Sequence, residues 1–295
     1  MTDTVKLKKD VFRPNTPINA DLLKLFAMTV MLIDHMGAFL IPMEDPLYRP
    51  LRTVGRLGFP IFCFLIAEGA HYTRSMPKYL GRLALFAIIS TPPYNLVHGS
   101  EWYSPDNVNV FFTLFLGLAA VYSLSKLPKA IFEWCGKFSL AESKTVCALV
   151  GLPLCALCYL AAFIMHTDYG EYGVAAILIF WLLRKQPFTA WLGFAALTFV
   201  FFGYFIQIPN MTGGFEYHRI NLYNTVTKLL FVPDAKLYYY IQIQMYAALA
   251  AVPCLLYNGK KSSAGTKHSD VIKYLFYAFY PVHLWCIWLV QLLRK

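Results

Sequence analysis

The sequence predicts an all-α, polytopic integral membrane protein that crosses the bilayer about nine times, with a cytoplasmic N-terminus. Three observations lead to this prediction. The 295-residue chain is 58% hydrophobic and only 14% charged, whereas a soluble domain carries about 25% charged residues. Its apolar residues form runs of about 18 residues, which is long enough to cross a bilayer. Its basic residues lie mostly in the short segments between these runs.

The expected spans follow the apolar runs in chain order. They cover residues 21–42, 53–72, 79–97, 108–125, 145–164, 173–184, 188–208, 237–257 and 272–292. The first run lacks the small-residue cleavage site of a signal peptide, so we expect it to remain in place as a span. The sixth run is short, which fits a tilted or partial crossing.

The domain organisation follows from these spans. Residues 1–20 form a polar, basic cytoplasmic tail, and residues 21–295 form a single membrane domain, because the apolar runs fill the chain evenly. Residues 209–236 are a long segment of mixed composition, expected to be extracytoplasmic or partly re-entrant. Backbone at membrane depth must be helical or covered by protein. No internal repeat is evident, so an inverted-repeat transporter finds no support there.

The positions of the basic residues predict the orientation. Most of the 26 Lys and Arg residues fall on one side of the membrane when the N-terminus is cytoplasmic, as the positive-inside rule requires. This side holds Lys6, Lys8, Lys9 and Arg13, then Arg74, Lys78 and Arg82, then Lys126, Lys129, Lys137 and Lys144, then Arg184 and Lys185, and finally Lys260, Lys261, Lys267 and Lys273. The C-terminus is therefore expected outside.

Several classes of function find little support. A net charge of +10 would suggest a nucleic-acid partner in a soluble protein, but here the basic residues serve topology and no nucleic acid is expected. Cys155 and Cys158 have a C-x-x-C spacing, yet they lie inside an apolar helix without nearby ligands. Cysteines with this spacing in an apolar helix more often contribute to helix packing than to redox chemistry or metal binding. No bound metal is therefore expected.

Ionisable side chains inside the expected spans are the candidate functional residues. Each costs roughly 2.5–3.5 kcal/mol at the centre of a bilayer, so each needs a partner, a water-filled cavity or a task. The first span holds Lys24, Asp34 and His35, and the second holds Arg56 and Glu68. The ninth holds Lys273, Tyr280 and His283, and Asp168 lies in an outside loop without basic residues.

Lys24 and His35 share one face of the first span. They are 11 positions apart, which is about three helical turns and about 16 Å along the axis. A cation at a cytoplasmic mouth can hold phosphates, and a histidine deeper in the same groove can act as a general base. This separation suits coenzyme A, which has a phosphorylated head and a long, thin arm.

Each of these residues also has a simpler interpretation. A single histidine in a span is more often a hydrogen-bond partner between helices than a catalyst. Lys24 alone is typical of a lysine that extends to the membrane surface, and Asp34 can neutralise Arg56 or His35 across helices. Tyr280 can be an aromatic residue of the membrane interface. The first two spans, however, hold several ionisable side chains whose burial in the bilayer is unfavourable. Such a cluster favours a functional site over a separate structural explanation for each residue.

Several segments of the sequence resemble the TraX family of membrane proteins. They are LLKLFAMTVMLIDHMGA, LRTVGRLGFPIFCFLIAEGAHYTRS, KYLGRLALFAIIS, NVFFTLFLGLAA, DYGEYGVAAILI and KYLFYAFYPVHLWCIWLV. Together they cover most of the chain in the family's order. The most specific combinations are Asp34-His35, Gly55-Arg56 with Phe59-Pro60, Glu68-Gly69, and Tyr280-Pro281 with His283.

The resemblance implies a transmembrane acyltransferase of the cytoplasmic (inner) membrane. Founding members of the family acetylate the N-terminus of conjugative pilin with acetyl-CoA. A broader, similar class of membrane acyltransferases carries a basic residue, ten residues and then a histidine in the first span, which Lys24 and His35 match. The resemblance thus makes His35 the catalytic histidine and Lys24 a coenzyme A contact, with Arg82 a second contact. The broader class often has two arginines near Arg82, and here Lys78 replaces one.

The leading hypothesis is therefore acetyl transfer from acetyl-CoA to a peptide or pilin amine, or to a glycan. His35 would act as the base, and Asp34 or a carboxylate from another span would set its tautomer. Arg56 would stabilise the developing negative charge. Glu68, Asp168, Lys273, Tyr280 and His283 are candidates for substrate or structural contacts. Two alternatives remain: an ion- or proton-coupled transporter whose path these residues line, and a non-catalytic assembly protein of a pilus or conjugation system.

Overall fold

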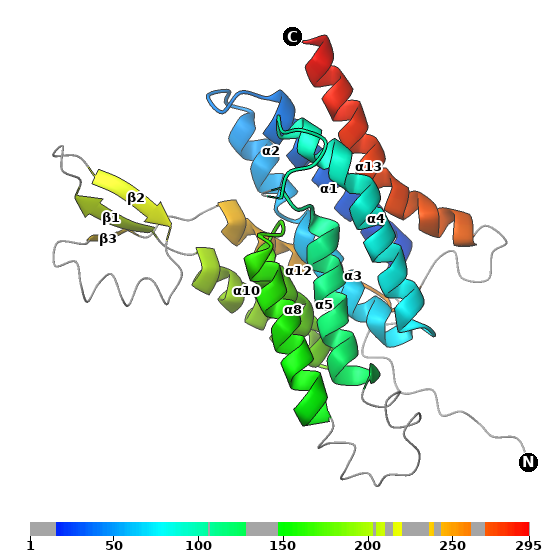
Figure 1. Cartoon of the computed structure of the whole chain (residues 1–295). Helices are drawn as coiled ribbons and strands as arrows, with labels where there is room; N and C mark the ends of the chain where they lie inside the picture. Colours follow the sequence, from blue (N-terminus) through cyan, green and yellow to red (C-terminus); the bar gives the residue numbers. More distant parts are fainter. Residues whose placement is uncertain are drawn as a thin grey trace, which may run out of the picture.

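The computed structural model of the chain describes residues 16–105, 107–127, 147–202, 205–209, 215–219, 236–238, 243–260 and 269–294. In these ranges the protein is mainly a bundle of helices, with a small sheet to one side (Figure 1). The helices are α1 (Ala20–Leu40), α2 (Tyr48–Gly55), α3 (Gly58–Tyr72), α4 (Met76–Val97), α5 (Val110–Ser125), η1 (Cys147–Gly151), α8 (Leu152–Ile164), α9 (Gly170–Leu182), α10 (Pro187–Phe202), η2 (Ile243–Ala250), α12 (Ala251–Leu255) and α13 (Ser269–Leu293).

Helix α1 is the element around which the site is built. It begins after Asn19, whose side chain accepts hydrogen bonds from the backbone N–H groups of Asp21 and Leu22 at 3.1 and 2.9 Å, an arrangement that satisfies helix-terminal donors. The helix packs against α2, α3 and α13. Near its other end, Arg294 donates to the carbonyl of Leu40 at 2.8 Å, so α1 and α13 run in the same direction. This agrees with the expectation that the first and the last span cross the membrane in the same direction.

The structure supports a helical membrane protein. Among the described residues, three segments are long and apolar enough to cross a bilayer: Ala20–Leu40, Tyr48–Tyr72 and Val271–Leu293. The second segment is divided into α2 and α3 at residues 56–57. Five shorter apolar helices cover most of the fourth to eighth expected spans, and α4 covers the third. The number of nine crossings stays a prediction.

A three-stranded antiparallel sheet was not predicted. It comprises β1 (Phe205–Pro209), β2 (Phe215–Arg219) and β3 (Lys236–Tyr238) in the order β2-β1-β3. Two expected spans had run into this region: the seventh was placed up to residue 208, but α10 ends at Phe202, and the eighth was placed from 237, but η2 begins at Ile243. The apolar residues of β1 are aromatic or β-branched and flank Gln207, a composition that favours a strand. The N-terminal tail up to residue 15 and most of the segment 209–236 lie outside the described residues.

Candidate functional site

A large cavity of about 520 Å³ opens beside the first half of α1. Its walls come from α1, α3, α4, α5 and α13, together with Tyr257 and Gly259, and most of the lining side chains are apolar. The charged residues in the lining are Lys24, Glu68, Arg82 and Lys273. The cavity therefore joins a long apolar interior to three basic side chains near one end of the bundle.

A smaller, more polar cavity of about 160 Å³ lies beside the second half of α1. Its polar lining residues are Asp34, His35, Arg52, Arg56, Tyr94, His98, Asp168, Tyr169 and Tyr280. Four residues line both cavities: Met31, Phe62, Val110 and Tyr280. The two cavities are thus adjacent along the axis of α1, and we call these four shared residues the wall between them.

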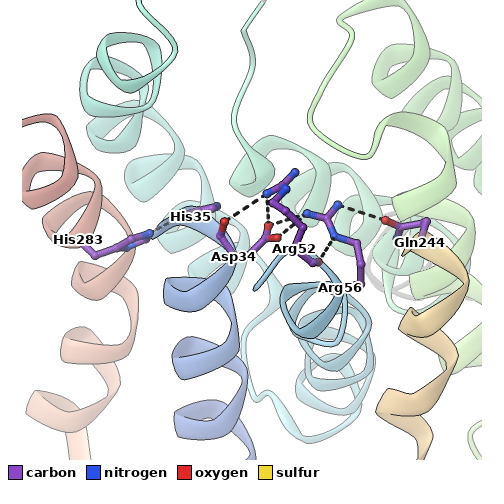
Figure 2. Close-up of polar contacts among 6 residues, drawn as sticks. All are labelled: Asp34, His35, Arg52, Arg56, Gln244 and His283. Atoms are coloured by element: carbon purple, nitrogen blue, oxygen red, sulfur yellow. Dashed lines mark hydrogen bonds and ion pairs between the residues drawn. The ribbon is translucent and has the colours of Figure 1, made fainter. Parts of the chain in front are cut away.

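Asp34 is held by two arginines of the second hydrophobic segment. Arg56 donates from Nη2 to both carboxylate oxygens of Asp34, at 2.6 and 2.7 Å, and Arg52 Nη1 lies 2.8 Å from Oδ2 (Figure 2). Gly55 allows this approach, because a Cβ at this position would collide with the Asp34 side chain. The carboxylate therefore neutralises two arginines. The sequence had suggested this pairing with Arg56 as a simpler alternative to a catalytic role for Asp34.

Arg56 makes further hydrogen bonds on its other sides. Its Nε donates to the backbone carbonyl of Arg52 at 3.1 Å, and its Nη1 donates to Gln244 Oε1 at 3.3 Å. Three elements, α1, the α2–α3 junction and η2, meet at this guanidinium (Figure 2). Arg56 therefore connects the helices around the polar cavity, and its hydrogen-bonding groups are used within the protein.

His35 is bound to a second histidine instead of a carboxylate. Its Nδ1 lies 2.6 Å from Nε2 of His283 on α13, and the two rings are stacked with centroids 4.9 Å apart (Figure 2). His283 Nδ1 in turn lies 2.8 Å from the carbonyl oxygen of Phe279. His283 does not line the polar cavity, whereas His35 does.

The carbonyl oxygen at the end of this chain determines the tautomers. A carbonyl can only accept, so His283 Nδ1 must carry the hydrogen. With both rings neutral, His283 Nε2 accepts a hydrogen bond from His35 Nδ1. His35 Nε2 is then left without a hydrogen and can accept a proton from a group in the polar cavity. His283 thus holds the hydrogen-bonding position on His35 that the sequence had suggested for Asp34.

His98 is a third histidine at the polar cavity, and the sequence did not single it out. It follows the end of α4, its Nδ1 donates to the carbonyl of Tyr94 at 2.7 Å, and its ring packs edge-to-face against Phe39 at 4.9 Å. Phe39 also contacts the ring of His35, with centroids 5.6 Å apart. His98 is exposed on its other side, so it lies where the polar cavity approaches the surface of the bundle.

The loop between α8 and α9 closes the polar cavity with Asp168. Its backbone N–H donates to the Val108 carbonyl at 2.7 Å, and Thr113 Oγ1 donates to its carbonyl. Tyr169 follows with a left-handed backbone (φ 68°), and its ring stacks on Phe59 at 3.6 Å. These contacts turn the Asp168 side chain into the lining of the cavity, where burial raises the pKa of its carboxyl group to about 6.

This raised pKa gives a testable pH dependence. The unfolded chain has an Asp pKa of about 3.9, so between about pH 4 and pH 6 the folded protein binds more protons than the unfolded chain. Stability therefore falls as the pH rises through this range. We expect Asp168→Asn to gain thermal stability relative to the parent as the pH rises, measured by melting in detergent at several pH values. An equal difference at all pH values would contradict this account.

A family model described as TraX protein matches residues 19–291 of the chain. The chain belongs to the TraX family. A curated relative, named probable fimbrial assembly protein FimC, serogroup H1, from Dichelobacter nodosus, is 34% identical over 114 residues. The match covers 36% of this chain and 47% of the relative, so it spans about half of that protein's length. No solved structure matches the chain.

The structure brings most of the predicted residues of this TraX-family protein to the two cavities. Lys24 lines the large cavity, pairs with Asp21 at 3.2 Å and lies over the Phe276 ring. Arg82 lines the same cavity, and its buried Nε has no hydrogen-bond partner among the described residues. Lys78 is exposed and is not part of the cavity lining, so its role as a coenzyme A contact stays a prediction.

Glu68 has its partner in a distant part of the chain, after the end of α9, as its spacing from Arg56 required. Glu68 accepts from Nε of Arg184 at 2.7 Å, and Arg184 Nη2 donates to the Tyr72 hydroxyl at 2.9 Å. Arg184 had been predicted only as one of the basic residues on the cytoplasmic side, and Arg52 had not been singled out. Arg52 is three positions before Gly55-Arg56, on the same helical face as Arg56, and this spacing is the signal that could have identified it.

Proposed function

We propose that this chain is a transmembrane acyltransferase that moves an acetyl group from acetyl-CoA to an acceptor. The large cavity holds the donor, and the polar cavity holds the acceptor group. The observation that carries the proposal is the arrangement of these cavities. Basic side chains lie at one end of a long apolar space, and His35 lies beyond the wall at its other end.

The donor fits the large cavity by its chemistry. The phosphates of coenzyme A would bind to Lys24, Arg82 and Lys273. Hydrogen bonds between a positively charged side chain and a phosphate are about twice as strong as those between neutral groups. The neutral pantetheine arm is matched by the apolar lining between them and the wall. The axial separation of Lys24 and His35, about 16 Å for 11 helical residues, allows the thioester to reach the histidine.

The reaction follows from the tautomer of His35. His35 Nε2 takes a proton from the acceptor hydroxyl or amine while the acceptor attacks the thioester carbonyl carbon. The C–S bond then breaks, and the proton on His35 passes to the leaving thiolate. His283 remains hydrogen-bonded to Nδ1 throughout and stabilises the transient imidazolium, as an orienting group does for a catalytic histidine. An ammonium acceptor loses one further proton before it attacks.

Transfer itself is the direct test. Purified protein in lipid vesicles is incubated with radiolabelled acetyl-CoA and membrane or secreted extracts of its source cells, and the labelled product is identified. Label in a peptide or a glycan supports the proposal and names the acceptor. Absence of any transfer, together with absence of thermal stabilisation by coenzyme A, contradicts it. Stabilisation by ions or small solutes instead would favour a transporter.

A non-catalytic assembly protein is the second candidate. The relative from Dichelobacter nodosus carries the name of a fimbrial assembly protein, and that name supports a role beside a pilus or fimbria without stating any chemistry. The candidates differ in what His35→Asn does. If the role is assembly alone, the parent protein forms no acyl product, and His35→Asn changes only the assembled fibre. If the protein is an acyltransferase, the parent forms an acyl product, and His35→Asn loses it.

Arg82 provides a test of the donor site. Its Nε is buried and lacks a partner among the described residues, and hydrogen bonds to charged groups contribute about 1.5–3 kcal/mol. We expect Arg82→Met to raise the Kd for coenzyme A about 10-fold, measured by titration calorimetry. Arg49→Met, at an exposed position that lines neither cavity, is the matched control. An unchanged Kd, or an equal loss of affinity for acetyl-pantetheine, which has no phosphates, would remove Arg82 from the donor site.

A further inference from the structure

Among the described residues, the wall between the two cavities contains one side chain that readily forms hydrogen bonds. The four residues that line both cavities are Met31, Phe62, Val110 and Tyr280, and the first three have apolar side chains. Tyr94 and Tyr169 line the polar cavity alone, and Tyr277 lines the large cavity alone. A thioester that reaches His35 from the large cavity meets this wall, and Tyr280 supplies the hydroxyl there.

The hydrogen of the Tyr280 hydroxyl has no acceptor among the described residues. The residue is 4% exposed, and the nearby backbone N–H of Val110 can only donate to Oη, which leaves the O–H able to donate elsewhere. Buried polar groups are almost always paired, so an unpaired one requires an explanation. The ring is held by packing: it is edge-on to Phe111 at 5.2 Å, to His283 at 5.5 Å and to His35 at 6.1 Å. The hydroxyl is therefore fixed near the catalytic histidine without being consumed by a partner.

The arginines beside the site are less suited to stabilise the reacting carbonyl. Arg56 donates to Asp34, to the Arg52 carbonyl and to Gln244, and Arg52 is ion-paired with the same Asp34 carboxylate. Both guanidinium groups are already neutralised in part by this carboxylate, and Arg56 uses all three of its nitrogens in these contacts. A donor that is preorganised in the site acts without rearrangement, and Tyr280 is such a donor.

We propose that the Tyr280 hydroxyl donates a hydrogen bond to the carbonyl oxygen of the thioester and stabilises its negative charge in the tetrahedral intermediate. This inference rests on the proposed acyl transfer. The acceptor forms a bond to the carbonyl carbon, the C=O electron pair moves to oxygen, and the oxygen accepts the hydrogen bond from Tyr280. When the carbonyl re-forms, the C–S bond breaks and the thiolate takes the proton that His35 had removed from the acceptor.

Tyr280→Phe tests this role. We expect kcat for transfer from acetyl-CoA to fall about 100-fold, the effect of removing one oxyanion donor, while the Kd for coenzyme A is unchanged. The unfolding temperature should change little, because the hydrogen of this buried hydroxyl has no acceptor to lose. A structural role would lower both stability and activity together, so the two measurements separate the explanations.

Tyr172→Phe is the matched control. It also removes a buried tyrosine hydroxyl, which is bonded to Thr198 at 3.0 Å outside both cavities, and it should retain parental kcat. If the parent transfers label from acetyl-CoA and Tyr280→Phe does so at the same rate, the role of Tyr280 is wrong and the acyltransferase stands. If the parent transfers nothing and coenzyme A does not bind, the proposed function itself fails.

Discussion

Replacing His35 with asparagine should lower acetyl transfer by about 100- to 10,000-fold, the range that a positioned acid–base group contributes. Asparagine keeps a hydrogen-bonding group near His283 Nε2, which lies 2.6 Å from His35 Nδ1 in the parent, so the connection between α1 and α13 is conserved in part. It has no nitrogen that can take a proton near neutral pH. The loss should therefore fall on kcat, measured with radiolabelled acetyl-CoA in vesicles.

The control for this variant is His166→Asn. His166 is exposed in the loop between α8 and α9 and has a left-handed backbone with φ 47°, a conformation that asparagine adopts more readily than most residues. This variant should fold and transfer acetyl groups like the parent. A His35→Asn protein that inserts, binds coenzyme A and transfers at the parental rate would rule out His35 as the base.

The sequence predicted the helical scaffold because bilayer insertion imposes a simple pattern on a chain. Apolar runs of span length and basic loops are visible without any structure, and they located α1, α3 and α13 closely. The sheet of β1, β2 and β3 was missed, since short strands of mixed composition leave a weak signal beside long apolar runs. The β1 strand was counted as the end of a span for this reason.

The sequence predicted how site residues are spaced along one helix, but it did not predict which residues pair between helices. The spacing of Lys24 and His35 follows from helix geometry, and each of the two residues lines one of the adjacent cavities. Pairing across helices depends on how the bundle packs, so the sequence left Asp34 open between His35 and Arg56. The structure pairs Asp34 with Arg56 and also with Arg52, which the sequence had not singled out. His98 was missed because it follows a helix end and belongs to no apolar run.

Replacing Asp34 with asparagine should destabilise the protein by roughly 3–5 kcal/mol, the cost of leaving buried charges without their partner. The carboxylate faces two guanidinium groups at 2.6 and 2.8 Å, and its residue is 7% exposed. Asparagine fits the same space but carries no charge, so Arg52 and Arg56 would repel each other inside the bundle. The free energy of unfolding in mild detergent, or the fraction of protein that stays monodisperse, measures this loss.

A double variant distinguishes charge imbalance from a simple loss of packing. Asp34→Asn combined with Arg56→Gln removes one positive charge as well, so it should recover part of the stability lost in Asp34→Asn, and the coupling between the two sites can be measured as a cycle. Glu44→Gln, which neutralises an exposed carboxylate, should change stability by less than about 0.5 kcal/mol. Equal stability of Asp34→Asn and the parent would mean that water or lipid headgroups already screen the two arginines, and the polar cavity would then be open to solvent instead of closed by this cluster.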